Sequence, residues 1–197
     1  MRRIFLFALV VSLFWSCTEE IDTSSRYVYK DKTIMQYLQG KDYYSEYVNL
    51  LGQVPVSSVS KTTMKQLLSA RGHYTVFAPT NDAVQEYLDT LCAQGLITDP
   101  SWDGFVNEED RDSIAKVIVY NSIIDSGDQH AYDVMDFPDH EHEFGLGNMN
   151  DRKLRVFYGT EDPDSISING KVTVNKKNRG ITLTNGFIHQ VDDVIAP

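Results

Sequence analysis

The segment "DHEHEF" (residues 139–144) carries the densest metal-ligand chemistry in the sequence. In an extended chain, His140 and His142 point to the same side, and imidazole with carboxylate is a workable ligand set for zinc or a similar ion. Further ligands would have to come from elsewhere, with Asp128 and His130 as candidates. A solvated acidic loop explains the same residues and is the interpretation that we favour. We therefore predict no metal and no other cofactor, and keep His140 and His142 as weak candidates.

The sequence offers no convincing nucleophile. It contains no G-x-S-x-G motif, and "GLGNM" lacks the third glycine and the strand-to-helix context of a nucleotide-binding loop. Thr80 has no evident base partner. Cys92 lies between Leu91 and Ala93, where no basic neighbour lowers a thiol pKa. We predict that the protein is not an enzyme.

The stretch "YTVFAPTND" (residues 74–82) joins a strand to a helix. The β-branched and aromatic run ends at Pro79, which cannot donate to a sheet ladder, and Thr80, Asn81 or Asp82 can cap the helix that follows. Hydrolases place nucleophiles on such sharp turns, so a catalytic turn is the alternative. We favour the structural hinge.

The N-terminus predicts export and lipid anchoring. Arg2 and Arg3 precede an apolar run that is too short for a stable membrane span, and Ser16-Cys17 follows it. This arrangement resembles the lipobox of bacterial lipoproteins, which implies acylation of Cys17; an ordinary cleaved signal is the alternative. We assign residues 1–16 to the signal peptide, 17–30 to a flexible acidic tether and 31–197 to one domain. Glu19 and Glu20 suggest display on the outer face of the outer membrane.

Charge and cysteine content narrow the partners. The 197-residue chain has a formal charge of −10, which falls to −12 when Arg2 and Arg3 are lost with the signal. Such a surface disfavours nucleic acid and anionic membrane surfaces. Membrane attachment would therefore depend on the lipid. The only other cysteine is Cys92, so lipidation of Cys17 leaves no disulfide within one chain.

Hydrophobic periodicity predicts an α+β domain. Helical spacing dominates the first half of the mature chain, and short strands dominate the second half. The helices are expected within residues 33–40, 41–52, 62–72, 80–92 and 111–124, and the strands within 73–78, 153–158, 165–168, 171–174, 180–184 and 187–196. Tyrosines at helical spacing within 41–52 are expected in the core. Asn169-Gly170 predicts a hairpin whose longer loop aligns Ile168 with Val172.

Two separated stretches resemble the signature segments of fasciclin-like domains. They are "YTVFAPTNDAV" (74–84) and "NGFIHQVDDVIAP" (185–197), and "TIMQYLQGKDYYSEYVNLL" (33–51) resembles the opening helices of that family. The resemblance implies a β-sheet wedge or sandwich with helices packed at one end, used for adhesion and extracellular binding rather than catalysis. The structural signature residues are Thr75, Phe77, Ala78, Pro79, Thr80, Asn81, Asp82, Asn185, Gly186, Ile188, His189 and Asp192.

Two positions follow from this resemblance. We expect His189, a lone histidine on an apolar strand, to be a structural group that bonds to backbone or to Asn81 or Asp82. Some animal adhesion proteins of the family carry a Tyr-His pair after the central helix, and it is linked to receptor binding. This chain has Tyr120-Asn121, so Tyr120 is a candidate adhesion position, but integrin-type recognition is not carried over.

These observations predict a lipid-anchored cell-envelope module for binding or adhesion, with a protein or glycan ligand. The loops within 53–61, 98–111 and 125–150 are the expected binding surfaces, because function often lies on connections between elements. Two alternatives stay open: an accessory subunit of an outer-membrane nutrient-uptake system for glycans, and a metal-binding envelope protein.

Overall fold

The computed structural model of the chain describes residues 28–29, 31–127, 130–133, 143–147, 149–150, 153–159, 162 and 165–196. Helices α2 to α4 precede the central strand β2, and helices α5 and α6 follow it. The helical segments are α2 (Ile34–Gln39), η2 (Asp42–Tyr44), α3 (Ser45–Gln53), α4 (Met64–Ser69), α5 (Asn81–Ala93), η3 (Trp102–Gly104) and α6 (Glu108–Asn121). The strands are β1 (Val28–Tyr29), β2 (Tyr74–Pro79), β3 (Ile123–Asp125), β4 (Glu143–Gly147), β5 (Lys153–Tyr158), β6 (Ile166–Ile168), β7 (Val172–Val174), β8 (Ile181–Leu183) and β9 (Gly186–Val191).

The helices begin at side chains that satisfy their free N–H groups. Thr33 and Thr63 each form a reciprocal capping box with a glutamine three residues later, at the starts of α2 and α4. The hydroxyl of Thr80 accepts from the Ala83 N–H at the start of α5. Polar residues that interrupt the hydrophobic pattern therefore mark where these helices start.

A mixed sheet is organised around the parallel pair β2 and β9. The two strands pair over six residues, from Tyr74 with Gly186 to Pro79 with Val191. On its other side β9 meets two strands in turn, so the sheet forks into a branch through β8 to β1 and a branch through β7, β6 and β5 to β4. Strand β3 pairs with the free side of β2. The two signature segments, over 100 residues apart in the sequence, thus become neighbours.

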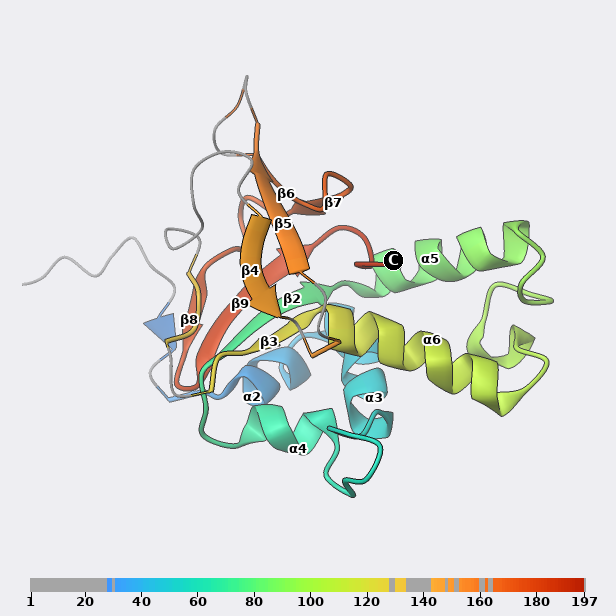
Figure 1. Cartoon of the computed structure of the whole chain (residues 1–197), viewed down its shortest axis with the longest axis horizontal. Coiled ribbons are helices and arrows are strands. Elements are labelled where there is room, and N and C mark those ends of the chain that lie inside the picture. Colours follow the sequence, from blue (N-terminus) through green and yellow to red (C-terminus); the bar gives the residue numbers. More distant parts are fainter. Residues whose placement is uncertain are drawn as a thin grey trace, which may run out of the picture.

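Both faces of β2 are buried, and they belong to two different cores. Tyr74, Val76 and Ala78 pack in the larger core, which the helices share with strands β8 and β9. Phe77 points the other way, into a smaller core inside the curled branch of the sheet. Alternation along one strand therefore connects the helical layer to the sheet interior. Figure 1 shows this sheet with α2 to α4 beside it, while α5 and α6 extend away together.

The structure confirms the α+β class and most element positions. Ile168 pairs with Val172, as the longer hairpin loop required. Tyr44 and Tyr47 are fully buried, as expected for core residues. The hydroxyl of Tyr47 lies 2.6 Å from that of Ser122, and burial raises the Tyr47 pKa above its ordinary value.

Two expectations about boundaries were wrong. The predicted helix over 111–124 ends at Asn121, because Ile123–Asp125 instead pairs with β2 as strand β3. The assignment of residues 17–30 to a tether overlaps β1, since Val28 and Tyr29 pair in parallel with Thr182 and Leu183 of β8. In both cases pairing with a distant strand overrides the local pattern. Across the part of the chain that the structure describes, none of the helices is both long and apolar enough to cross a bilayer.

Candidate functional site

The signature residues of β2 are buried in the centre of the sheet. The Thr75 hydroxyl accepts a hydrogen bond of 2.8 Å from the Tyr132 N–H, and the ring of Phe77 stacks on that of His189. Ala78 and Pro79 continue the strand opposite Gln190 and Val191. These side chains are inaccessible to a ligand, so their role is structural.

Asn185 joins three elements just before β9. Its side-chain oxygen accepts from the Ile34 N–H at the start of α2 (2.9 Å), and its amide donates to the carbonyls of Leu68 (2.9 Å) and Ala70 (2.8 Å) at the end of α4. The residue is only 3% exposed. One amide thus satisfies backbone groups at the ends of two helices where no helix partner exists.

Gly186 allows β9 to approach β2. Its φ of 144° lies in the region that side-chain-bearing residues avoid, and a Cβ added here would lie 1.8 Å from the carbonyl oxygen of Tyr74. The close parallel pairing of the two signature strands therefore requires glycine at this position.

His189 is fully buried with both ring nitrogens engaged. Nδ1 accepts from the Gly180 N–H (3.1 Å), which leaves the proton on Nε2, and this nitrogen donates to the Tyr132 carbonyl (3.0 Å). Burial disfavours the charged ring and lowers the His189 pKa to about 4, although the Tyr132 carbonyl and Asp133 oppose the shift. The prediction of a structural histidine is confirmed.

The proposed pairing of His189 with Asn81 or Asp82 was wrong. Asn81 instead accepts from the Glu46 N–H (3.0 Å) and donates to the Asp42 carbonyl and the Ser45 hydroxyl (3.0 Å each). It thus connects the start of α5 to the start of α3. Asp82 is exposed in the first turn of α5.

The remaining signature residues also have structural contacts. Thr80 uses its hydroxyl to cap α5, which leaves the catalytic-turn alternative without support. Ile188 is fully buried opposite Val76. Asp192 is exposed, and one of its carboxylate oxygens lies 3.5 Å from the Asn175 amide.

Tyr120 and Asn121 hold neighbouring segments in place. Tyr120 is half-buried at the end of α6, and its hydroxyl donates to the Pro55 carbonyl at 2.5 Å. Asn121 is buried and donates to the Ile195 carbonyl at 2.8 Å. The packing interpretation of Tyr120 fits these contacts.

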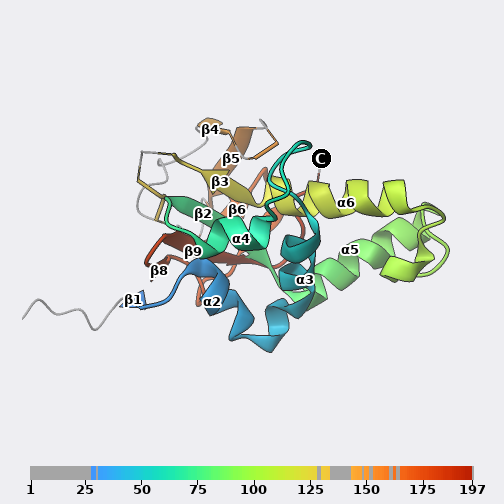
Figure 2. The ribbon, with the colours of Figure 1, turned by 90° about the horizontal axis from the view of Figure 1, so that it is seen from below.

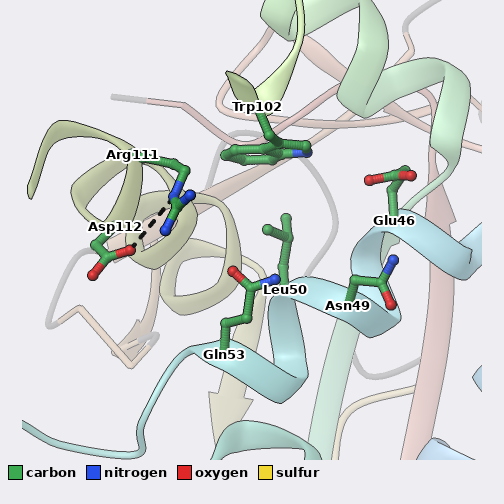
Figure 3. A pocket seen from close by; sticks show the side chains of 7 residues that line it. All are labelled: Glu46, Asn49, Leu50, Gln53, Trp102, Arg111 and Asp112. Carbon is green, nitrogen blue, oxygen red and sulfur yellow. Dashed lines mark ion pairs between the residues drawn. The ribbon is translucent and has the colours of Figure 1, made fainter. Parts of the chain in front are cut away.

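An open cleft of about 550 Å³ lies away from this region, between α3, η3 and the start of α6. Its α3 wall consists of residues at positions i, i+3, i+4 and i+7, which form one face of a helix. These are Glu46, Asn49, Leu50 and Gln53. Figure 3 shows the Trp102 indole facing Leu50 of this wall, with Arg111 on one side of the indole and Glu46 on the other.

The loop that carries Trp102 is held by its own backbone. Both the N–H and the hydroxyl of Thr98 donate to the Gly104 carbonyl, at 2.9 and 3.0 Å. The Phe105 ring stacks against the indole with centroids 5.8 Å apart and planes within 16°. A Cβ at Gly104 would lie 2.2 Å from the Asp99 carbonyl oxygen, so the turn requires glycine. The indole is therefore positioned before any ligand arrives.

Arg111 brings hydrogen-bond donors to the cleft from the first turns of α6. Its Nε lies 3.9 Å from the Asp112 carboxylate, an ion pair with both side chains well exposed. Solvent screens such a pair, so it holds the guanidinium weakly. Although the Arg111 side chain as a whole is partly exposed, its Nε atom is buried, and within the described residues this atom has no hydrogen-bond partner.

Sequence reasoning located part of this cleft. The loop over 98–111 was an expected binding surface, and it contributes Trp102 and Arg111. Trp102 stacks with Phe105 of the same loop, and its place in a cleft does not follow from the sequence pattern. The polar face of α3 was not predicted either, because the apolar stripe within 41–52 is the stronger pattern in that segment. The i, i+3, i+7 spacing of polar residues was the available signal.

Cys17, His140 and His142 lie outside the described residues. In the part of the chain that is described, no group of three or more metal-ligating side chains comes together.

Comparisons with known proteins agree with the architecture. The family model described as "Fasciclin domain" matches residues 53–197. Seventeen chains of solved structures match. One is a FAS1 domain pair from the insect cell adhesion molecule fasciclin I. It matches with a TM-score of 0.57 and 19% sequence identity, over 85% of this chain and 52% of that one. The chain thus spans about half of that structure. No curated protein matches.

Proposed function

The chain belongs to the fasciclin domain family, whose modules are associated with cell adhesion, and on this premise we propose that it is a lipid-anchored, non-enzymatic binding module of the cell envelope. Acylated Cys17 would hold many copies at the outer membrane. Weak contacts made by each copy would then add by avidity.

This proposal is supported chiefly by the positions of strand β1 and of the loop between α5 and α6, which lie at opposite ends of the molecule (Figures 1 and 2). The chain enters the fold at β1, and the loop that joins α5 and α6 lies at the opposite end of the molecule (Figures 1 and 2). A module tethered ahead of β1 would therefore present the α5–α6 end, with Trp102, away from the membrane.

A binding role without catalysis is supported by the chemistry of the reactive side chains. The Thr80 hydroxyl caps a helix and the His189 ring is engaged on both sides. Both groups are used by the fold, whereas the cleft residues line an open surface.

Anchoring is tested with Cys17→Ser in the native host, with Cys92→Ser as the matched control. We expect Cys17→Ser to lose incorporation of a labelled fatty acid and to leave the membrane fraction, while Cys92→Ser keeps both properties. Membrane retention of unlabelled Cys17→Ser would contradict the lipid anchor.

Adhesion is tested by comparing cells that carry the wild-type protein, cells that carry Cys17→Ser and cells that lack the protein. On cells that carry the anchored protein, external protease is expected to cleave this chain. These cells are also expected to adhere or aggregate more than the other two strains. Equal adhesion by all three strains would contradict the adhesion role.

A further inference from the structure

We propose that the cleft between α3, η3 and α6 binds a neutral sugar residue of a glycan, stacked on the face of Trp102. This inference rests on the proposed binding function and names the ligand chemistry of its site. The residues that line the cleft lie between Glu46 and Asp112 in the sequence, and none of them belongs to the two signature strands.

Trp102 provides an aromatic platform for a sugar ring. A pyranose ring has a face of C–H groups, whose slight positive charge suits the negative face of an indole. Trp102 is partly exposed and lines the cleft on the side that faces Leu50 (Figure 3). Its ring also stacks with that of Phe105 and packs against the edge of the larger core. Because the loop contacts of Thr98 and Gly104 fix this ring in advance, binding loses little side-chain entropy.

Hydrogen-bond donors and acceptors of mixed kind surround that platform. Each sugar hydroxyl donates one hydrogen bond and accepts others. Asn49 and Gln53 supply both donors and acceptors, Glu46 supplies acceptors and Arg111 supplies donors. They surround the position in front of the indole, so neighbouring hydroxyls on the edge of a ring can meet partners of opposite kind.

The charges of the cleft favour a neutral ligand. Glu46 and Asp112 carry two negative charges and Arg111 carries one positive charge, so the lining is net acidic, as is the whole chain at −10. This field opposes a carboxylate or phosphate ligand, although Arg111 alone would attract one. A ligand rich in hydroxyls and without charge fits the whole set.

The size of the cleft suits a single sugar residue. The volume of about 550 Å³ falls within the ~300–1,000 Å³ typical of small-ligand sites. The cleft is open, so one residue of a longer glycan can enter while the rest of that chain continues into solvent.

The experiment uses the full processed protein in detergent. The sequence has two tryptophans, Trp15 and Trp102, and cleavage before Cys17 removes the first. Tryptophan emission then reports on this cleft alone. The protein is applied to an array of neutral and acidic glycans, and emission and calorimetric titrations follow with a neutral oligosaccharide that binds and with trigalacturonic acid. We expect neutral binding that changes Trp102 emission and varies little between about 50 and about 500 mM salt.

Single substitutions measure separately how much the Trp102 ring and its polar neighbours contribute to glycan affinity. Trp102→Ala is expected to weaken neutral-glycan binding about tenfold or more, and Asn49→Ala about threefold, each measured by calorimetry. Val106→Ala is the matched control, because this residue is 83% exposed nearby and does not line the cleft. Its affinity should be unchanged. Asn49→Ala keeps the test decisive if Trp102→Ala does not fold.

Three outcomes would overturn the inference. They are binding to acidic glycans only, no glycan binding, and neutral binding that neither Trp102→Ala nor Asn49→Ala weakens. Adhesion of cells in the absence of glycan binding would remove the sugar site and leave the adhesion function standing. Glycan binding by the purified protein without any adhesion of cells would support the sugar site and contradict the adhesion function.

Discussion

The join between β2 and β9 and the cleft beside α3 use similar polar residues in opposite ways. At the join, the amide of Asn185 and the ring of His189 are buried, and each polar atom has a backbone partner. In the cleft, Asn49 is exposed, and among the described residues the guanidinium of Arg111 has a single, weakly held ion pair with Asp112. A satisfied polar group stabilises a fold, whereas a group that faces solvent can bind a ligand.

This difference explains why the signature segments do not reveal the ligand. Their side chains hold together strands and helix ends that are distant in the sequence, and a change there should alter stability before it alters binding. The cleft should behave the other way round. The following predictions test this division, from the largest effect to the smallest.

Gly186→Ala should abolish folding or lower the free energy of unfolding by more than about 4 kcal/mol. The alanine Cβ would overlap the Tyr74 carbonyl in the central strand pair. Urea unfolding followed by circular dichroism measures the loss. Gly170→Ala is the control: Gly170 also has positive φ, at 69°, but its Cβ would meet only Phe157 at 3.9 Å. It should cost about 1 kcal/mol. Equal losses at both positions would show that close approach to β2 does not matter.

Asn185→Ala should cost roughly 3 kcal/mol, since it leaves the Ile34 N–H and the carbonyls of Leu68 and Ala70 without this partner. Chemical unfolding gives the value. Asn49→Ala, the same change in the cleft, should leave the free energy of unfolding within about 0.5 kcal/mol. A smaller loss at Asn185 than at Asn49 would break the comparison.

His189 should make stability depend on pH. Its folded pKa of about 4 lies below the ordinary 6.5, so the unfolded chain binds more protons between these values. Its contribution is complete above about pH 6.5 and falls as the pH drops toward 4, by about 3 kcal/mol in all.

The measurement is urea unfolding of the wild type and of His189→Phe across this pH range. His189→Phe keeps an aromatic ring beside Phe77, should be less stable at pH 7, and should lose this part of the pH dependence. Parallel stability curves for the two proteins would mean that His189 does not titrate as the structure implies.

Gly104→Ala should lower the free energy of unfolding by less than Gly186→Ala or Asn185→Ala does, by about 1–2 kcal/mol, because the clash with Asp99 lies in a surface loop. It should instead displace Trp102, seen as a shift in tryptophan emission and faster hydrogen exchange at Thr98. Val106→Ala on the same loop should change neither. A global loss as large as that of Asn185→Ala would place this loop in the folding core.

Local patterns were sufficient for much of the architecture. The capping residues, the glycine turns and the periodicity of apolar residues predicted most helices and strands, and the Asn169-Gly170 turn predicted the pairing of Ile168 with Val172. Residues 122–124 were misjudged because a β-branched run next to a helix suits either state, and pairing with β2 decides between them.

What the sequence by itself determined was the α+β class, the family and the structural nature of His189, because these depend on residue types and short spacings. Tertiary structure alone decided the partners of His189 and Asn81, and it alone placed Trp102 and Arg111 opposite the polar face of α3. The contact of His189 with Tyr132 and that of Asn81 with Glu46 join residues 57 and 35 positions apart. Their geometry depends on how the helices pack, and spacing along the chain carries no record of that packing.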